Sequence, residues 1–323
     1  MEQETTRTDA HSGLLTVIVP ALNEEENIPL IADRIADVLG GADIPYEVLF
    51  VDDGSRDGTF ARIREAAAKN ECVRGVSFAR NFGKEAAIFA GFAEARGRCC
   101  AVIDSDMQQP PETLVEMYRA WQGGCDIVEG VKRSRGDEKT AGGLFARLFY
   151  RILGRLTGFD MQNASDYKLL DRSVVEILRS LPERNTFFRG LTFWTGFPMA
   201  RVEYDVAPRL HGKSKWSFGK LVRYALANIT NFSSAPLNII TATGAVFCIF
   251  AVVLGVQSLV RYFSHNSVEG FTTVILLQLL SIGAVLLSLG LIGHYVAKIY
   301  EEVKGRPRYV IHKSTEKDGD GTR

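Results

Sequence analysis

The sequence has few cysteines, and they show none of the spacings that would give them a common role. The five are Cys72, Cys99, Cys100, Cys125 and Cys248, with no Cys-x-x-Cys pair and no histidine at a zinc-ligand spacing. Their scatter argues against a disulfide framework or a zinc site and favours a reducing compartment. An excess of either charge is also missing, since 38 basic residues balance 38 acidic ones. No overall field therefore attracts nucleic acid.

Three further signatures are missing. No Gly-x-Gly-x-x-Gly follows the first expected strand, so a dinucleotide cofactor is not expected. No Ser/His or Cys/His arrangement supplies a covalent nucleophile. Residues 1–13 are polar and charged, which predicts a flexible tail rather than a signal peptide.

What the first half of the chain does contain is a regular alternation of apolar runs and helical periodicity. The expected strands are Leu14–Pro20, Tyr46–Val51, Val73–Phe78, Cys99–Ile103 and Asp126–Val131. A helix is expected after each of the first four, and Asn23 is predicted to be the N-cap of the first helix, which extends to about Leu39. This alternation predicts an α/β fold with a mostly parallel, Rossmann-like sheet.

Two carboxylates, Asp104 and Asp106, follow the expected strand Cys99–Ile103 and precede the turn at Pro110 and Pro111. Ligands of open α/β sheets bind at the carboxyl ends of the strands. Mg²⁺ typically takes one or two carboxylates together with substrate phosphate oxygens. The spacing therefore indicates a metal site, with an ordinary Asp-Ser-Asp turn as the alternative.

Acidic residues also follow the first and second expected strands, as Glu24 with Glu25 and as Asp52 with Asp53. Carboxylates gathered at one sheet edge repel one another unless a cation or a donor-rich ligand compensates them. A nucleotide with a metal-bound diphosphate would do so. The alternative is a set of solvated turns.

Long hydrophobic runs are confined to the end of the chain. Residues 237–260 and 271–297 contain no Asp, Glu, Lys or Arg, and about 20 residues suffice to cross a bilayer. We therefore expect two transmembrane helices within residues 236–297, preceded by an amphipathic juxtamembrane segment at 217–235. Arg261 is the only basic residue of the connecting loop, whereas Lys220 and Arg223 precede the first span and several follow the second. The positive-inside rule then predicts cytoplasmic termini, including a C-terminal tail at 298–323.

Seven motifs together resemble the family 2 glycosyltransferases of the GT-A fold, and more narrowly those that use a polyprenyl-phosphate acceptor. They are VIVPALNEEENI (17–28), VDDGSRDGT (51–59), ARNFGKEAAIFAG (79–91), IDSDMQQPPE (103–112), DYKLLDR (166–172), ERNTFFRGL (183–191) and GKSKW (212–216). The resemblance implies a cytoplasmic GT-A domain at 14–216 and a C-terminal transmembrane hairpin. One departure is Gln109, where the family commonly has an acidic residue.

The resemblance also implies the roles of individual residues. Nucleotide-sugar binding falls to Pro20, Asn23, Glu24, Glu25, Asp52, Asp53, Lys84, Asp104 and Gln108. Asp106, with Asp104, would hold Mg²⁺ or Mn²⁺, and the acceptor phosphate would contact Arg189, Arg209, Lys213 and Lys215. The expected catalytic residues are Asp166, Asp106 and Lys84.

Two of these assignments have alternatives. Asp166 matches the position proposed as the catalytic base, but a phosphate monoester with a second pKa near ~6 has little proton to lose, so we expect Asp166 to orient the acceptor. A strand-end cap is the structural alternative for Asp166. Lys213 and Lys215 could instead be interfacial anchors for anionic lipid.

The expected function is the inverting transfer of a sugar to undecaprenyl phosphate at the inner membrane, for O-antigen or other cell-envelope modification. UDP-glucose is the first choice of donor, while GDP-mannose and UDP-linked amino sugars stay open. A processive polysaccharide synthase, a membrane-bound nucleotide-sugar sensor or scaffold and a lipid flippase are the competing hypotheses. Glycines in the spans, such as Gly244 and Gly283, would allow close packing between copies of the chain.

Overall fold

The computed structural model describes residues 13–133, 165–183, 186–206, 235–263 and 271–316. It divides into two compact units, Met1–Ser217 with Arg306–Arg323 and Phe218–Gly305, and each is described by itself. The expected juxtamembrane segment at 217–235, apart from its last residue, and the expected N-terminal tail, apart from Gly13, lie outside the described residues.

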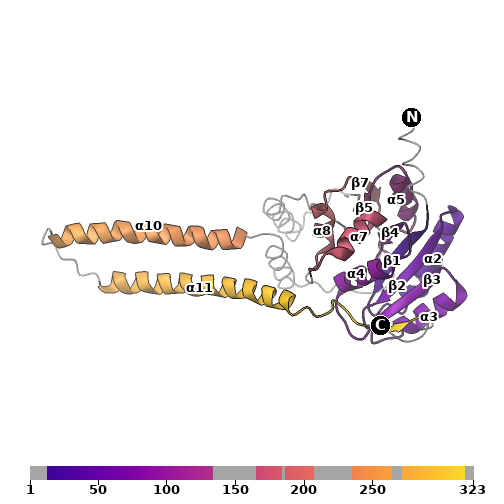
Figure 1. Ribbon diagram of the computed structural model, residues 1–323, viewed down its shortest axis with the longest axis horizontal. Coiled ribbons are helices and arrows are strands. Elements are labelled where there is room, and N and C mark those ends of the chain that lie inside the picture. Colours follow the sequence, from indigo (N-terminus) through magenta and orange to yellow (C-terminus); the bar gives the residue numbers. More distant parts are fainter. Residues whose placement is uncertain (1–12, 134–164, 184–185, 207–234, 264–270, 317–323) are drawn as a thin grey trace. The chain divides into compact units, whose positions relative to one another are not determined.

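An eight-stranded mixed sheet runs through the described part of the larger unit in the order β7-β5-β6-β4-β1-β2-β3-β8 (Figure 1). The strands are β1 (Leu15–Ala21), β2 (Tyr46–Asp52), β3 (Val73–Phe78), β4 (Cys99–Val102), β5 (Ile127–Lys132), β6 (Lys168–Asp171), β7 (Met199–Tyr204) and β8 (Ile311–Ser314). β1 pairs in parallel with β2 and β4, whereas β6 and β8 run antiparallel to their neighbours. The predicted mostly parallel α/β sheet is confirmed.

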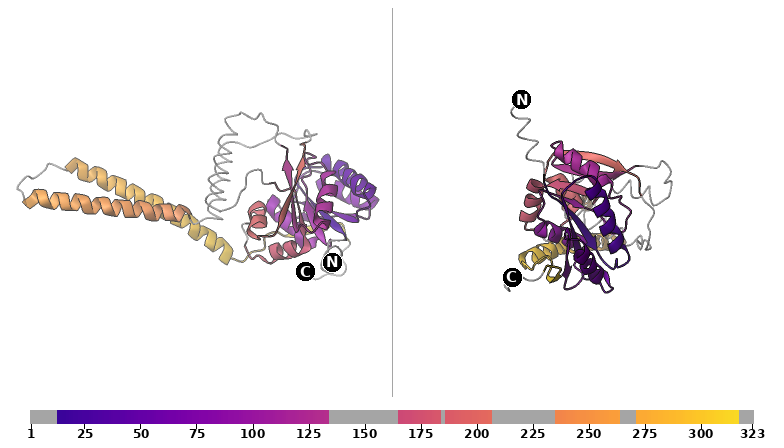
Figure 2. Two further views of the ribbon diagram at one scale, coloured as in Figure 1. Left: turned by 90° about the horizontal axis from the view of Figure 1, so that it is seen from above. Right: turned by 90° about the vertical axis from the view of Figure 1, so that its right-hand side faces the viewer.

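Helices cover both faces of this sheet (Figure 2). One layer contains α2 (Asn27–Gly41), α3 (Thr59–Lys69) and α5 (Thr113–Gln122), and the other contains α4 (Lys84–Glu94) and α7 (Arg172–Ser180), with α8 (Phe188–Trp194) against α7. All seven residues of β1 are buried. Val17 and Val19 join the core cluster that includes α2 and α5, while Ile18 lies against α4. Burial on both faces explains the continuous apolar run.

The N-cap predicted at Asn23 is wrong, because α2 begins only at Asn27. Asn23 has a positive φ of 56°, a conformation that its short amide side chain tolerates. Its backbone N–H donates to Ser55 Oγ at 2.9 Å, and its Oδ1 accepts from the Arg56 N–H at 3.0 Å. Asn23 therefore connects the loops after β1 and β2 instead of capping a helix.

Two edge strands, β7 and β8, were not predicted from the sequence. β8 follows the second apolar helix and pairs antiparallel with β3, with Val76 opposite Ser314 and Ser77 opposite Lys313. The Ala79 N–H donates to the carbonyl of Val310 at 3.0 Å, which continues the contact beyond the strand. Part of the expected C-terminal tail is thus a strand of the sheet.

The smaller unit contains two long helices, α10 (Ala235–Phe263) and α11 (Phe271–Val303), that contact each other. By length and composition both can cross a membrane, through Ile240–Gln257 and Leu277–Val303, and neither stretch is buried within the protein. The spans expected at 237–260 and 271–297 lie inside these two helices.

A single glycine allows α4 to lie close to the sheet. A Cβ on Gly91 would come within 2.3 Å of Ile18 Cγ2, so Gly91→Ala should destabilise the larger unit by about 1–3 kcal/mol through overpacking. Gly40→Ala in α2, where a Cβ would meet nothing within 4 Å, is the matched control. Thermal unfolding should show a lower Tm for the first variant alone. Equal Tm values for both variants would contradict this packing account.

Candidate active site

A cavity of about 220 Å³ lies where β1, β2 and β4 end, and we name it the first cavity. Its lining contains most of the residues that the sequence analysis assigned to the nucleotide sugar. They are Pro20, Glu24, Asp53, Lys84 and Asp104, with the expected metal ligand Asp106 beside them. The other four, Asn23, Glu25, Asp52 and Gln108, do not line it.

A second cavity of about 270 Å³ shares Asp104 with the first. Its other lining residues are Gln108, Gln109, Lys132, Ser165, Asp166, Arg189 and Tyr204. Asp166 and Arg189, which are 23 residues apart in the sequence, both line this cavity. The remaining expected acceptor contacts, Arg209, Lys213 and Lys215, lie outside the described residues.

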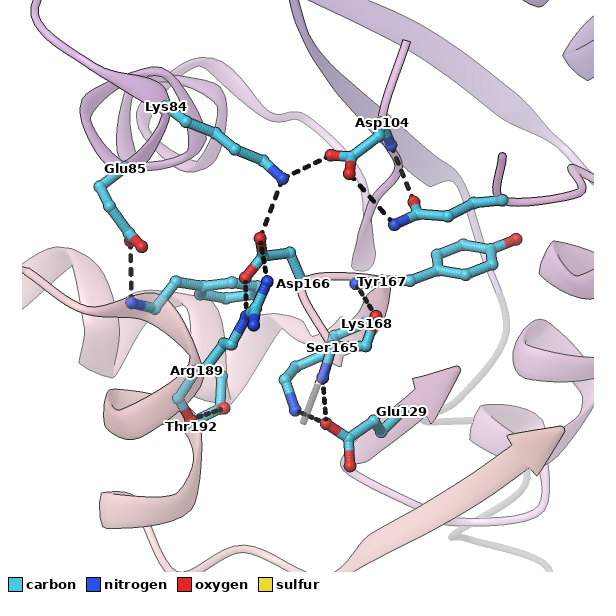
Figure 3. Close-up of polar contacts among 12 residues, drawn as sticks. Lys84, Glu85, Asp104, Glu129, Ser165, Asp166, Tyr167, Lys168, Arg189 and Thr192 are labelled. Carbon is cyan, nitrogen blue, oxygen red and sulfur yellow. Dashed lines mark hydrogen bonds and ion pairs between the residues drawn. The ribbon is translucent and has the colours of Figure 1, made fainter. Parts of the chain in front are cut away.

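Lys84 links the two cavities (Figure 3). It is the first residue of α4, directly after Gly83, and its Nζ lies 2.6 Å from Asp104 Oδ1 and 2.9 Å from Asp166 Oδ2. Burial opposes the charge of the ammonium group, but Asp104 and Asp166 outweigh it and raise the pKa of Lys84. The cation therefore stays charged between the two carboxylates.

Arg189 holds Asp166 in a bidentate pair. Its Nε donates to Oδ1 at 2.6 Å and its Nη2 donates to Oδ2 at 2.9 Å. Burial disfavours the charge of the Asp166 carboxylate, but Lys84 and Arg189 outweigh burial and hold its pKa well below the ordinary value. A carboxylate with so low a pKa does not take up a proton at neutral pH. Asp166 is therefore poorly suited to act as a general base.

A buried ion pair between Lys168 and Glu129 holds the segment that carries Asp166. Lys168 Nζ lies 2.5 Å from Glu129 Oε1, with side chains 0% and 1% exposed. The same Glu129 oxygen accepts from the Ser165 N–H at 3.1 Å. Lys168 Nζ also lies 4.9 Å from the centroid of the Phe193 ring in α8. The segment that carries Asp166 is thus fixed to β5 and to α8 through Glu129, Lys168 and Phe193, none of which lines either cavity.

Gln109 stands where the family that the motifs resemble commonly has an acidic residue. Its side chain contacts Asp104 in two ways. Its Oε1 accepts from the Asp104 N–H at 2.8 Å, and its Nε2 donates to Asp104 Oδ2 at 3.3 Å. A carboxylate at this position could make the first contact but not the second. The departure therefore strengthens the hold on the Asp104 side chain.

Asp52 and Asp53 are buried and bonded within the protein, so the alternative of a solvated turn is wrong for them. Asp52 accepts from the Ser77 hydroxyl at 2.6 Å. Asp53 accepts from the N–H groups of Phe82 and Gly83. Burial raises the pKa of Asp53, against these two hydrogen bonds. Asp53 thereby holds the loop that leads into Lys84.

Four residues near the expected site were missed by sequence reasoning. Lys132 and Tyr204 end β5 and β7, and Ser165 and Glu85 precede and follow assigned residues in the chain. The Tyr204 side chain is 3% exposed, and its hydroxyl has no hydrogen-bond partner within the described part of the chain. The rule that sites lie at strand ends could have found Lys132, because β5 was predicted. It could not have found Tyr204, because β7 was not.

Glu85 connects α4 to the helix that carries Arg189. Its Oε2 accepts from the Phe188 N–H, at the first residue of α8, at 2.8 Å. Burial, with help from the negative charge of Asp166, raises the pKa of Glu85 to about 7. The Phe188 N–H, Lys84 and Arg189 act in the opposite direction. Glu85 thus titrates close to neutral pH.

Comparison with known proteins agrees with this geometry. Residues 16–178 match the model of the family "Glycosyl transferase family 2". An uncharacterized glycosyltransferase of Synechocystis is 36% identical over 92% of this chain and 94% of its own. A bactoprenol glucosyl transferase of Shigella phage SfII is 34% identical over 93% of this chain and 98% of its own. The chain belongs to the family 2 glycosyltransferases.

Solved structures support the fold. Glucosyl-3-phosphoglycerate synthase from Mycobacterium tuberculosis, in complex with Mn²⁺, UDP and glucosyl-3-phosphoglycerate, superposes with a TM-score of 0.52 at 23% identity. The match covers 70% of this chain and 82% of that one. The same enzyme with Mg²⁺ and UDP gives a TM-score of 0.51. The described sheet is therefore a GT-A fold, as the sequence predicted.

The pKa of Glu85 predicts a pH-dependent stability. Between its ordinary pKa of 4.5 and about 7, the folded state holds a proton that the unfolded state has lost. The stability contributed by protonated Glu85 is complete below pH 4.5 and lost as the pH rises to 7. Glu85→Gln cannot ionise and does not lose this stability. Its Tm minus that of the parent chain should therefore increase as the pH is raised from 5 to 8.

The matched control is Glu65→Gln, which changes an exposed carboxylate on α3. Its Tm difference from the parent should stay constant over the same pH range. A constant difference for Glu85→Gln as well would contradict the raised pKa.

Proposed function

We propose that this glycosyltransferase moves glucose from UDP-glucose to a polyprenyl phosphate, at the cytoplasmic face of the membrane. The observation that carries the proposal is the pair of cavities meeting at Asp104, with Lys84 bonded to a carboxylate of each. Two substrates could meet across this boundary. The bactoprenol glucosyl transferases among the relatives supply the choice of acceptor and sugar.

The donor occupies the first cavity in this proposal. Pro20 and Glu24 border the nucleotide, Asp53 faces its base or ribose, and Lys84 approaches the diphosphate. Asn23, Glu25 and Asp52 act indirectly, because their contacts hold the loops around the cavity. Gln108 faces the second cavity and would meet the sugar from that side.

Charge balance favours a divalent cation with the donor. Among the described residues that line the two cavities, five are carboxylates and three are cations. The carboxylates are Glu24, Asp53, Asp104, Asp106 and Asp166, and the cations are Lys84, Lys132 and Arg189. A diphosphate and a phosphate would add further negative charge. Asp106, with Asp104, fits Mg²⁺ or Mn²⁺, which accept carboxylate and phosphate oxygens. Such an ion would stabilise the charge that develops on the leaving diphosphate.

The acceptor phosphate occupies the second cavity. Arg189 and Lys132 carry the positive charge there, and the hydroxyls of Ser165 and Tyr204 are available as donors. A phosphate oxygen forms a bond to the anomeric carbon as the bond from that carbon to the diphosphate breaks, which inverts the configuration. The electron pair of the broken bond leaves with the nucleoside diphosphate. An ionised phosphate loses no proton in this step, so no general base is needed.

Asp166 acts in this scheme as the anchor for Lys84 and Arg189. It holds both cations at the boundary of the two cavities while carrying no proton itself. This role differs from the expectation that Asp166 itself orients the acceptor, because Asp166 here acts through Lys84 and Arg189. It also accounts for its burial, which a solvated cap would not need.

The membrane location rests on α10 and α11, which are long and apolar enough to span a bilayer. We infer a multi-pass protein of the inner membrane with both termini and the catalytic domain in the cytoplasm, because basic residues flank the two helices. With that topology, the catalytic domain and the phosphate of a lipid acceptor in the cytoplasmic leaflet would lie on the same side of the membrane.

The deciding experiment measures transfer of radiolabelled sugar to undecaprenyl phosphate by the full chain in detergent. UDP-glucose should yield a lipid-linked sugar, and EDTA should abolish its formation. Product from GDP-mannose or a UDP-amino sugar alone would replace glucose in the proposal. No lipid product from any donor, by a chain that remains folded, would overturn the proposal and favour a nucleotide-sugar sensor.

Two matched substitutions separate the roles of the carboxylates. Asp106→Asn should lower kcat by about a hundredfold or more, because it removes electrostatic stabilisation of the leaving group. Asp166→Asn should lower it by roughly tenfold, the size expected for loss of a supporting partner. Both are read from initial rates at saturating UDP-glucose and Mg²⁺. An equal loss in both variants would contradict the anchoring role of Asp166.

A further inference from the structure

A third cavity of about 510 Å³ lies within the larger unit, and none of its lining residues belongs to the first two. Phe89 of α4, Arg179 and Leu181 at the end of α7, and Arg308 with Tyr309 from the C-terminal segment contribute to it. We propose that this cavity binds a phosphate-bearing anion, the headgroup of an anionic membrane lipid. The site is separate from the sugar-transfer chemistry.

The charge at this cavity is predominantly positive. Arg179 and Arg308 line it. A third arginine, Arg172, forms an i,i+4 ion pair with Glu176 on the same helix as Arg179. Glu176 is shared between Arg172 at 2.6 Å and Arg179 at 2.9 Å. The carboxylate of Glu94 also acts on Tyr309. Surface pairs such as Arg179 with Glu176 contribute little, so a phosphate can compete for the guanidinium.

Arg308 is held in a fixed orientation before any ligand binds. Its guanidinium lies 4.9 Å from the centroid of the Phe89 ring, and it donates to the carbonyl of Leu181. A planar guanidinium that is already oriented loses less freedom on binding phosphate than a mobile side chain does. The cavity therefore offers a preorganised cation.

Tyr309 is fixed in the same way and adds a neutral donor. Its ring stacks on Phe78 with centroids 5.1 Å apart and an angle of 13° between the planes. Burial raises the pKa of Tyr309, so its hydroxyl keeps its proton and can donate to an anion. The cavity thus combines two guanidinium groups with a phenol.

The connectivity of the chain favours a membrane lipid as the source of the phosphate. α11 ends at Val303, and Pro307 lines the cavity four residues later. The stretch 304–310 contains Lys304, Arg306 and Arg308 and no acidic residue. Such basic stretches beside a span attract anionic headgroups.

The test measures lipid retention by the full chain in nanodiscs, without any sugar donor, so its outcome is independent of transfer activity. The nanodiscs contain phosphatidylcholine with or without phosphatidylglycerol, and native mass spectrometry counts retained lipid. The parent chain should retain phosphatidylglycerol and show a higher Tm in its presence. Arg179→Ala should weaken that retention about fivefold, the effect of losing one cationic contact.

Arg62→Ala is the matched control, because Arg62 forms an i,i+3 pair with Glu65 on α3 just as Arg179 does with Glu176. It should retain phosphatidylglycerol like the parent. Arg308→Gln, which removes the charge but keeps a polar side chain, should also weaken retention. Equal retention by all variants would overturn the proposal. If inorganic phosphate in phosphatidylcholine nanodiscs raised the Tm as much as phosphatidylglycerol does, the bound anion would not be a lipid headgroup.

Discussion

A row of alternating charges joins the loop after β4, the start of α4, the start of β6 and the helix α8. Lys84 lies between Asp104 and Asp166, and Arg189 pairs with the far side of Asp166. Removing one member would leave a half-buried charge uncompensated, which costs more than an intact pair contributes. The row therefore fixes where four segments from distant parts of the sequence lie, and both cavities depend on it.

Much of the fold could be predicted because the central strands are buried on both faces. Burial gave these strands apolar stretches, such as residues 17–19 of β1, residues 48–51 of β2 and Cys99–Val102 of β4, and therefore a signal that a single sequence carries. β8 has no such signal, since all four of its residues, including His312 and Lys313, are exposed. Its place depends on backbone hydrogen bonds to β3, which is more than 200 residues away and which no local pattern encodes.

The same contrast holds for the site. Strand-end carboxylates such as Asp53 and Asp104 could be found because parallel strands end at one edge of the sheet. Their neighbours could not, since Tyr204 joins the second cavity through an unpredicted strand and Glu85 meets Phe188 only in three dimensions. Asn23 shows the opposite error. A residue typical of helix N-caps instead bonds to the neighbouring loop, and only the pairing of β1 with β2 brings that loop close.

The edge of the second cavity has a consequence for a lipid acceptor. Lys132 and Tyr204 both line this cavity, and each stands within two residues of the point where the described chain stops. The sequences that continue from them are unusual for a neutral protein. One combines arginines with Phe145, Leu148 and Phe149, and the other is rich in lysine and arginine from residue 209 to residue 223. In the sequence, a segment with apolar residues and a basic segment thus follow two residues that line the cavity we propose for the acceptor phosphate. A small, soluble sugar acceptor would need neither an apolar nor a basic segment beside it. A phosphate on a long apolar tail could bind the basic segment through its charge and the apolar residues through its tail.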